Sequence, residues 1–190
     1  MKRIEKTIYE EVKKRCELPT NTYGIGAWDH HIKVVYELAK RYASDYGANL
    51  EIVSLAALLH DIASVTNVEF TEEHHIIGAT IAEDLLKKEE YQIDKIELIK
   101  KCILNHRGSK LKEKISPEEV CIADCDAMAH FYSIPSLLSM VYREKKLSID
   151  DGSEFVLAKL ERSYNKMSDL GKSLVEKKYK SAKEILRFKI

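Results

Sequence analysis

Residues that interrupt helices are scarce in this chain. Only three prolines and seven glycines occur in 190 residues, and no stretch rich in proline, glycine or serine marks a linker between domains. Strand patterns are nearly absent, whereas apolar residues recur throughout at the three- and four-residue spacing of helices. The sequence therefore predicts an all-α fold, a single helical bundle domain that spans residues 1–190.

Long apolar runs and a net charge are also missing. No stretch approaches the about 18 consecutive apolar residues of a membrane span, and Met1–Lys6 lacks the apolar core of a signal peptide. The 31 basic side chains balance the 31 acidic ones, whereas a protein that binds nucleic acid usually carries a basic excess. We therefore expect a cytoplasmic protein that has neither a membrane nor nucleic acid as a partner.

The four cysteines form no Cys-x-x-Cys pair. In a reducing compartment we expect them to be buried as small apolar residues and not joined in disulfides. Cys121 and Cys125 stand four residues apart on one predicted helix and could share a soft metal. A structural zinc site, however, normally needs four closely spaced ligands.

Helical periodicity divides the chain into about nine segments. Pro19 ends the first, and Ser116-Pro117-Glu118-Glu119 begins the sixth with a capping box and a proline at the first helical position. The expected helices cover 3–17, His31 to about Gly47, 49–63, 71–89, 94–106, Ser116 to about Phe131, 134–145, 152–167 and 170–188. The motif-bearing core is about 27–132, and the helices of 134–190 are expected to pack on it or on a partner such as a second copy of the chain.

Imidazoles and carboxylates lie on the apolar faces of these predicted helices. Side chains three or four residues apart share a helix face, and an unpartnered polar group in the interior costs roughly 2–7 kcal/mol. The residues placed inward by this spacing are His31, His74, His106 and Asp124, and the adjacent pair His60-Asp61 ends the apolar run of residues 52–59. Coordination of a shared cation would remove the cost. Such a mixed nitrogen and oxygen set suits a divalent transition metal, namely Mn, Fe, Co, Ni or Zn, as one or two ions.

Neighbouring residues leave some of these assignments open. His75 could exchange roles with His74, and Asp126 could replace Asp124 as a ligand or orient a ligand or a water molecule. No pattern supports His130 as a ligand.

The chain resembles the HD-domain superfamily of metal-dependent phosphohydrolases. The resemblance spans about 30–130 and is carried by Asp29-His30-His31-Ile32-Lys33-Val34-Val35, by Ala56-Ala57-Leu58-Leu59-His60-Asp61 and by Ile122-Ala123-Asp124-Cys125-Asp126-Ala127-Met128. It implies the helical HD-domain fold, with His31, His60, Asp61 and Asp124 as the primary metal ligands. By resemblance to binuclear members, His74 and His106 would hold a second metal, although His106 could equally contact a substrate phosphate.

The resemblance predicts hydrolysis of a phosphoester in a nucleotide or another small phosphorylated metabolite. Asp61, His106 and Arg107 are the candidate catalytic residues, Arg107 because a guanidinium offers phosphate a forked set of donors. The HD-GYP branch has a second histidine at the position of Arg107 and a Gly-Tyr-Pro signature beyond it. Neither occurs here, so cyclic-di-GMP hydrolysis is not expected. Two alternatives are an HD-fold di-iron oxygenase, which uses a similar ligand set, and a non-catalytic nucleotide-binding domain.

Overall fold

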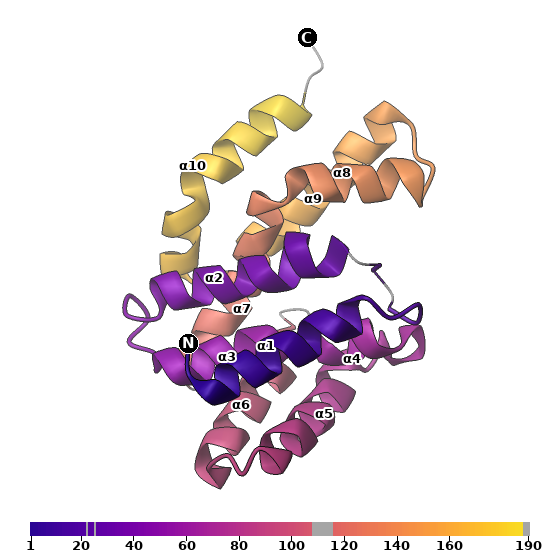
Figure 1. Ribbon diagram of the computed structural model, residues 1–190. Coiled ribbons are helices and arrows are strands. Elements are labelled where there is room, and N and C mark those ends of the chain that lie inside the picture. Colours follow the sequence, from indigo (N-terminus) through magenta and orange to yellow (C-terminus); the bar gives the residue numbers. More distant parts are fainter. Residues whose placement is uncertain (22, 25, 108–115, 188–190) are drawn as a thin grey trace.

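The chain forms a bundle of helices (Figure 1). The computed structural model describes residues 1–21, 23–24, 26–107 and 116–187. Within these ranges every regular element is helical, which confirms the all-α prediction. The ten α-helices are α1 (Arg3–Cys16), α2 (Lys33–Tyr42), α3 (Leu50–Leu59), α4 (Ile62–Thr66), α5 (His74–Lys88), α6 (Ile93–Asn105), α7 (Pro117–Tyr132), α8 (Ile134–Arg143), α9 (Ile149–Lys166) and α10 (Asp169–Leu186).

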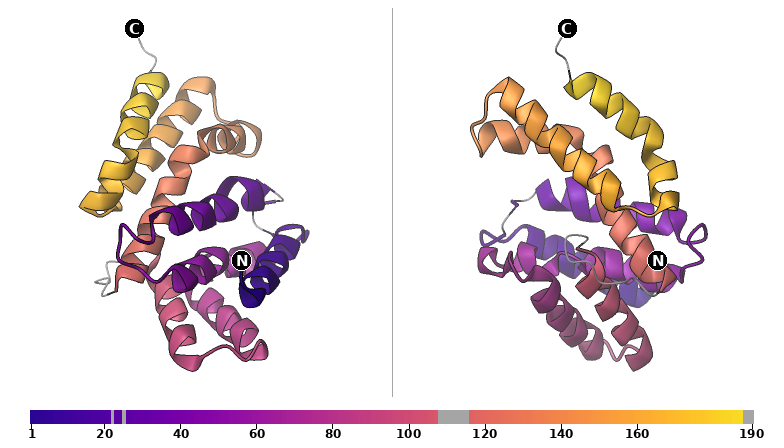
Figure 2. Two further views of the ribbon diagram at one scale, coloured as in Figure 1. Left: turned by 60° about the vertical axis from the view of Figure 1, so that its left-hand side comes forward. Right: turned by 180° about the vertical axis from the view of Figure 1, so that it is seen from behind.

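Helix α7 lies between the helices that precede it and those that follow it. It begins with the predicted capping box at Ser116. Helices α2, α3 and α6 pack against it, as do α9 and α10. Figure 2 shows α8, α9 and α10 gathered on the opposite side of α7 from α5 and α6. The assignment of the whole chain to a single domain stays a prediction.

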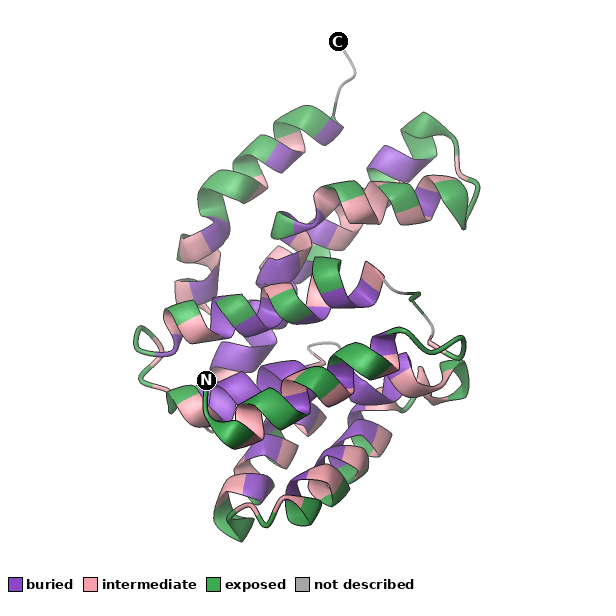
Figure 3. Ribbon diagram, in the orientation of Figure 1, coloured by how far each residue is buried: buried purple, intermediate pink, exposed green. Residues whose placement is uncertain are grey.

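The core is continuous around two helices that are buried on every side. Every residue of α3 from Ile52 to Leu59 is buried, and so is every residue of α7 from Cys121 to Ala129. Figure 3 shows the buried residues on the inward faces of the surrounding helices. All four cysteines are buried free thiols, as the sequence predicted. In the part of the chain that the structure describes, no helix has the length and apolar character needed to span a bilayer.

The predicted helix over 49–63 is in fact two helices. Helix α3 ends at Leu59, and α4 begins at Ile62, with Asp61 between them at φ −109° and ψ 16°. On an unbroken helix, consecutive side chains point about 100° apart. The break redirects the chain, and both His60 and Asp61 contact His31. The predicted end of the last helix, residue 188, lies outside the described residues.

A π-helical turn precedes α2. It covers Trp28–Ile32 and carries His31, and the Lys33 N–H donates to the carbonyl of Trp28, five residues earlier. Turns of this kind are rare and concentrate at functional sites. A short 3₁₀ turn, Val68–Phe70, lies between α4 and α5.

Candidate metal centre

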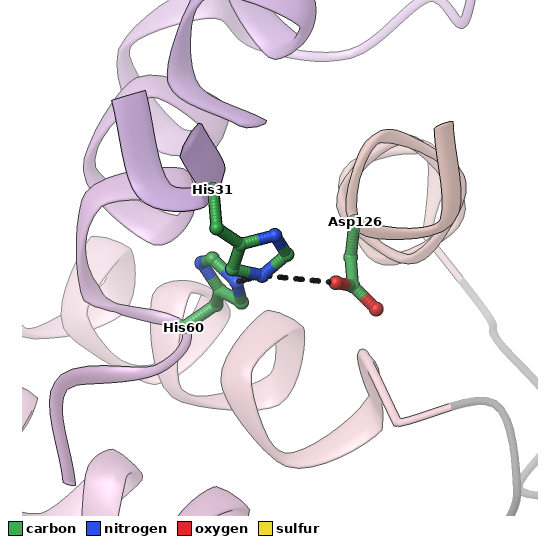
Figure 4. Close-up of side chains that lie close together, drawn as sticks. All are labelled: His31, His60 and Asp126. Atoms are coloured by element: carbon green, nitrogen blue, oxygen red, sulfur yellow. Dashed lines mark hydrogen bonds and ion pairs between the residues drawn. The ribbon is translucent and has the colours of Figure 1, made fainter. Parts of the chain in front are cut away.

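Three candidate ligand side chains meet at α7: His31 from the π-helical turn, His60 from the C-terminal end of α3, and Asp126 from α7 itself. The Nε2 atom of His31 lies 3.1 Å from Nε2 of His60 and 3.3 Å from Oδ1 of Asp126. Figure 4 shows the two rings near each other, with Asp126 approaching from α7. These side chains, here called the first group, each place a ligand atom within 4.8 Å of the others. Such a spacing could accommodate a metal ion.

A second group consists of Asp61, His74 and His106. The Nε2 atoms of His74 and His106 lie 3.3 Å apart, and Oδ1 of Asp61 lies 3.6 Å from the first and 3.7 Å from the second. The ligand atoms of this group also lie within 4.8 Å of one another. The group therefore meets the same geometric requirement for holding a metal ion.

Asp61 joins the two groups. Its Oδ1 faces the second group, whereas its Oδ2 lies 3.3 Å from Nε2 of His31 and 3.5 Å from Nε2 of His60. One carboxylate thus offers an oxygen to each group. This arrangement is suited to a pair of cations that share a bridging ligand.

Backbone carbonyls fix the tautomers of three of the histidines. The Nδ1 atoms of His60, His74 and His106 lie 2.8, 2.7 and 2.6 Å from the carbonyl oxygens of residues 57, 71 and 103. A carbonyl oxygen can only accept, so each Nδ1 carries the proton and donates it. In the neutral form of each ring Nε2 then presents a lone pair, and the Nε2 atoms of His74 and His106 face each other. A cation satisfies both, and metal-binding histidines commonly donate their other N–H in this way.

Charge in the site also favours a cation. Burial lowers the pKa of His60, and burial together with the nearby His60 lowers that of His106 to about 4, so both rings are neutral near pH 7. Burial acts to raise the pKa of Asp61, but the neighbouring imidazoles outweigh it and hold the pKa well below its usual range. Lys166 and His31 do the same for Asp126. The site therefore combines the neutral imidazoles of His60 and His106 with ionised carboxylates.

His31 differs from the other ligands. Burial opposes its protonation, but the carboxylates of Asp126 and Asp61 outweigh burial and raise the pKa of His31 to about 9. Its side chain is 22% exposed, whereas that of His60 is fully buried. Solvent therefore reaches the site at His31.

The structure places Asp126 in the first group and Asp124 outside both groups, which favours the alternative that the sequence left open. The carboxylate of Asp124 accepts hydrogen bonds from the hydroxyl of Tyr46 at 2.8 Å, from the backbone N–H of Ser168 at 3.1 Å and from the hydroxyl of Ser168. Ser168 is the N-cap of α10. Asp124 therefore ties α7 to α2's C-terminal loop and to the start of α10, and it belongs to neither group.

Other predicted residues lie at the margins of the site. Arg107 follows His106 and donates from Nη1 to the carbonyl of Glu72 at 2.9 Å. His75 is buried with its ring centroid 5.7 Å from that of His74, and it is part of neither group.

His130 and Lys166 were not predicted for the site. His130 stacks on His31 at a centroid distance of 5.6 Å, and Lys166 Nζ lies 3.3 Å from Oδ2 of Asp126. Lys166 is 40 residues from its partner in sequence, and no sequence pattern connected the two.

Comparison with known families agrees with this architecture. The HD-domain family matches residues 28–130, which include every residue of both groups. The structure of YpgQ from Bacillus subtilis is 18% identical and covers 96% of this chain and 94% of its own, with a TM-score of 0.69. The same protein in complex with ADP has a TM-score of 0.60 at 17% identity, over 94% of each chain. A predicted HD superfamily hydrolase from an uncultured Thermotogales bacterium is 20% identical over 96% of this chain and 88% of its own, with a TM-score of 0.62. These likenesses establish the fold.

Sequence relatives cover a smaller part of the chain. Ribonuclease Y of Petrotoga mobilis is 31% identical over 108 residues, which is 57% of this chain and 19% of that protein. Ribonuclease Y of Thermosipho melanesiensis matches at the same identity and coverage. The chain thus spans about a fifth of the length of these curated relatives.

Proposed function

This chain belongs to the HD-domain family, and from that premise we propose that it is a metal-dependent phosphohydrolase. The proposed substrate is a phosphoester in a nucleotide or another small phosphorylated metabolite. The observation that carries the proposal is the pair of ligand groups joined by Asp61, in which the histidine lone pairs face one another.

The ligand set proposed here is that of the two groups. His31, His60 and Asp126 would hold one divalent cation, His74 and His106 a second, and Asp61 would contact both. Mn, Fe, Co, Ni and Zn all suit this mixture of imidazole and carboxylate. When bound, such cations supply Lewis acidity, which lowers the pKa of water and withdraws charge from a phosphoryl oxygen.

Two of the candidate catalytic residues act as ligands in this proposal. A general base works best with a pKa near the operating pH, and the pKa of Asp61 lies far below that range. Asp61 is therefore better suited to bridge two cations than to accept a proton. His106 has Nδ1 engaged by a carbonyl and Nε2 in the second group, so it is proposed as a ligand and not as a phosphate contact.

Arg107 remains the proposed phosphate contact. Its Nη1 donates to the Glu72 carbonyl, which holds the guanidinium beside the start of α5. A guanidinium has five N–H donors in a rigid fork, so donors remain for a phosphate oxygen. The fork binds phosphate in a fixed orientation.

Two observations bear on the substrate. The Bacillus subtilis protein that shares this fold was solved with ADP, which supports a nucleotide. The names of the sequence relatives indicate RNA as a substrate, but 31 basic and 31 acidic residues give this chain no basic excess. A small phosphorylated molecule is therefore the proposed substrate.

The test is a panel of nucleotides, sugar phosphates and simple phosphate esters assayed with Mn, Co, Ni, Mg and Fe. Metal-dependent phosphate release by the wild type, absent from His60→Ala prepared in parallel, would support the proposal. The variant controls for contaminating phosphatase. Oxygen consumption that requires iron, with no ester cleaved, would instead identify an oxygenase. Tight nucleotide binding without turnover under every metal would identify a binding domain.

A further inference from the structure

Helix α9 presents a line of polar and cationic side chains to the candidate metal centre. Lys159, Ser163 and Lys166 are spaced four and three residues apart, which places them on one face of the helix. Two contacts orient this face. Ser163 Oγ lies 3.0 Å from Nδ1 of His130 on α7, and Lys166 Nζ lies 3.3 Å from Oδ2 of Asp126. The face therefore points at α7 beside the first group.

Asp126 stands between this face and the other two members of the first group, His31 and His60. Its Oδ1 is directed at His31 and its Oδ2 at Lys166. The side chain of Lys166 is 27% exposed and that of His31 is 22% exposed, so solvent reaches both sides of the carboxylate. A ligand that spans Asp126 could contact a cation held by the first group at one end and α9 at the other.

Lys159 is a cation without a neutralising partner at contact distance. Among the described residues no carboxylate forms an ion pair with its ammonium, although Lys166 pairs with Asp126 nearby. Burial lowers the pKa of Lys159, the fields of Lys166 and Arg162 lower it further, and that of Asp126 opposes them. Burying a charge is unfavourable unless it is paired. An anion at this position would relieve that cost.

We propose that Lys159 and Lys166 form an anion subsite on α9 that holds a second phosphate group of the substrate, next to the one that is hydrolysed. The subsite lies beyond residues 28–130, the part that matches the HD-domain family. It selects substrates with two or more linked phosphates over simple monoesters, because a single phosphate on the first group cannot also reach the far side of Asp126. This inference rests on the hydrolase function proposed above.

The test compares the binding of two probes by calorimetry in the presence of Mn²⁺. One is α,β-methylene-ADP, whose two phosphorus atoms resist cleavage from each other, and the other is AMP, which lacks the second phosphate. A charged hydrogen bond contributes enough to change affinity by about tenfold or more. We expect wild type to bind the first probe at least about tenfold more tightly than AMP. In Lys159→Met this preference should fall to near parity, with the affinity for AMP unchanged.

Lys177→Gln on α10 is the matched control, since Lys177 is exposed and should leave both affinities unchanged. Equal affinities in wild type, or a Lys159→Met variant that weakens both probes alike or neither, would overturn the subsite. Because Lys159 is half-buried and its charge is unpaired, Lys159→Met should fold as well as wild type. If Lys159→Met does not fold, the relative affinities of wild type for the two probes still test the subsite. The binding measurement needs no turnover. A failed phosphate-release assay would therefore refute the proposed hydrolase function and leave the measured difference in affinity between the two probes unaffected.

Discussion

Two aspartates on α7, two residues apart, should respond to replacement in opposite ways. Asp126 places an oxygen in the first group, whereas Asp124 is 3% exposed and accepts three hydrogen bonds from Tyr46 and Ser168. Asp126→Ala should therefore lose metal, and Asp124→Ala should lose stability. The pair separates a ligand from a structural carboxylate on the same helix.

The cost of Asp124→Ala follows from its three hydrogen bonds. Each hydrogen bond to a charged group contributes about 1.5–3 kcal/mol, and a buried donor left unpaired adds to the loss. Since Ser168 can still cap α10 through its hydroxyl and the N–H of Gly171, we expect a total of about 4 kcal/mol in the free energy of unfolding. For a chain of this size that corresponds to a melting temperature lower by about 8–16 °C.

Asp126→Ala removes ion pairs with His31 and Lys166, whose side chains are 22% and 27% exposed, so metal-free it should lose less stability than Asp124→Ala. Its affinity for one ion should fall at least about tenfold. Urea unfolding of the metal-free proteins measures the free energy of unfolding, and scanning calorimetry measures their melting temperatures. Competition with a chelator measures the affinity for the metal ion. The reasoning is refuted if Asp124→Ala loses metal at unchanged stability while Asp126→Ala retains it.

Three further results are expected. His60→Ala and Asp61→Ala should each abolish metal retention and activity with helical content largely intact, and near-normal metal by elemental analysis together with normal circular dichroism would contradict this. Despite its burial, His31 has a pKa raised to about 9 by neighbouring carboxylates, so it is protonated near neutral pH in the metal-free protein. Its charged form then stabilises the metal-free fold below pH ~6.5, and this contribution disappears as pH rises through about 9. Metal binding requires the neutral ring and should release about one proton, measurable by calorimetry in buffers of different ionisation enthalpy; a value near zero would argue against His31 as a ligand. Gly171→Ala should destabilise the protein by about 1–3 kcal/mol although alanine favours helices, because the new Cβ would collide with the Asp124 carboxylate. An unchanged urea midpoint would show that the contact relaxes freely.

The sequence predicted the helices, and it singled out five of the six side chains that form the two groups, because helices and their inward faces both depend on local spacing. His31 and His106 each lie one turn from apolar residues that the structure buries, and His60-Asp61 follows a helix that is buried from Ile52 to Leu59. His74 lies one turn from Ile77, which is half-buried. Such patterns report which face of a helix turns inward. Such patterns are informative where a helix has one buried face and one exposed face.

Local spacing could not decide between Asp124 and Asp126 as the ligand. Helix α7 is buried from Cys121 to Ala129 on all sides, so an apolar neighbour does not indicate which direction leads to the metal centre. Lys166 was missed because it reaches Asp126 from a different part of the chain. Its helix is amphipathic, and lysines on such helices are ordinarily solvated. Contacts of this kind depend on tertiary packing, which local patterns do not report.

The wide turn at Trp28–Ile32 makes the position of His31 sensitive to chain length. The hydrogen bond from Lys33 to Trp28 encloses one residue more than an α-helical turn would. Deleting one residue here would restore ordinary winding and swing the imidazole by about 100°, away from its partners. A substitution can exchange one chemical group for another, but a shortened backbone would leave the right group facing the wrong way. Natural variation in length should therefore be tolerated in the loop before this turn and excluded from the turn itself.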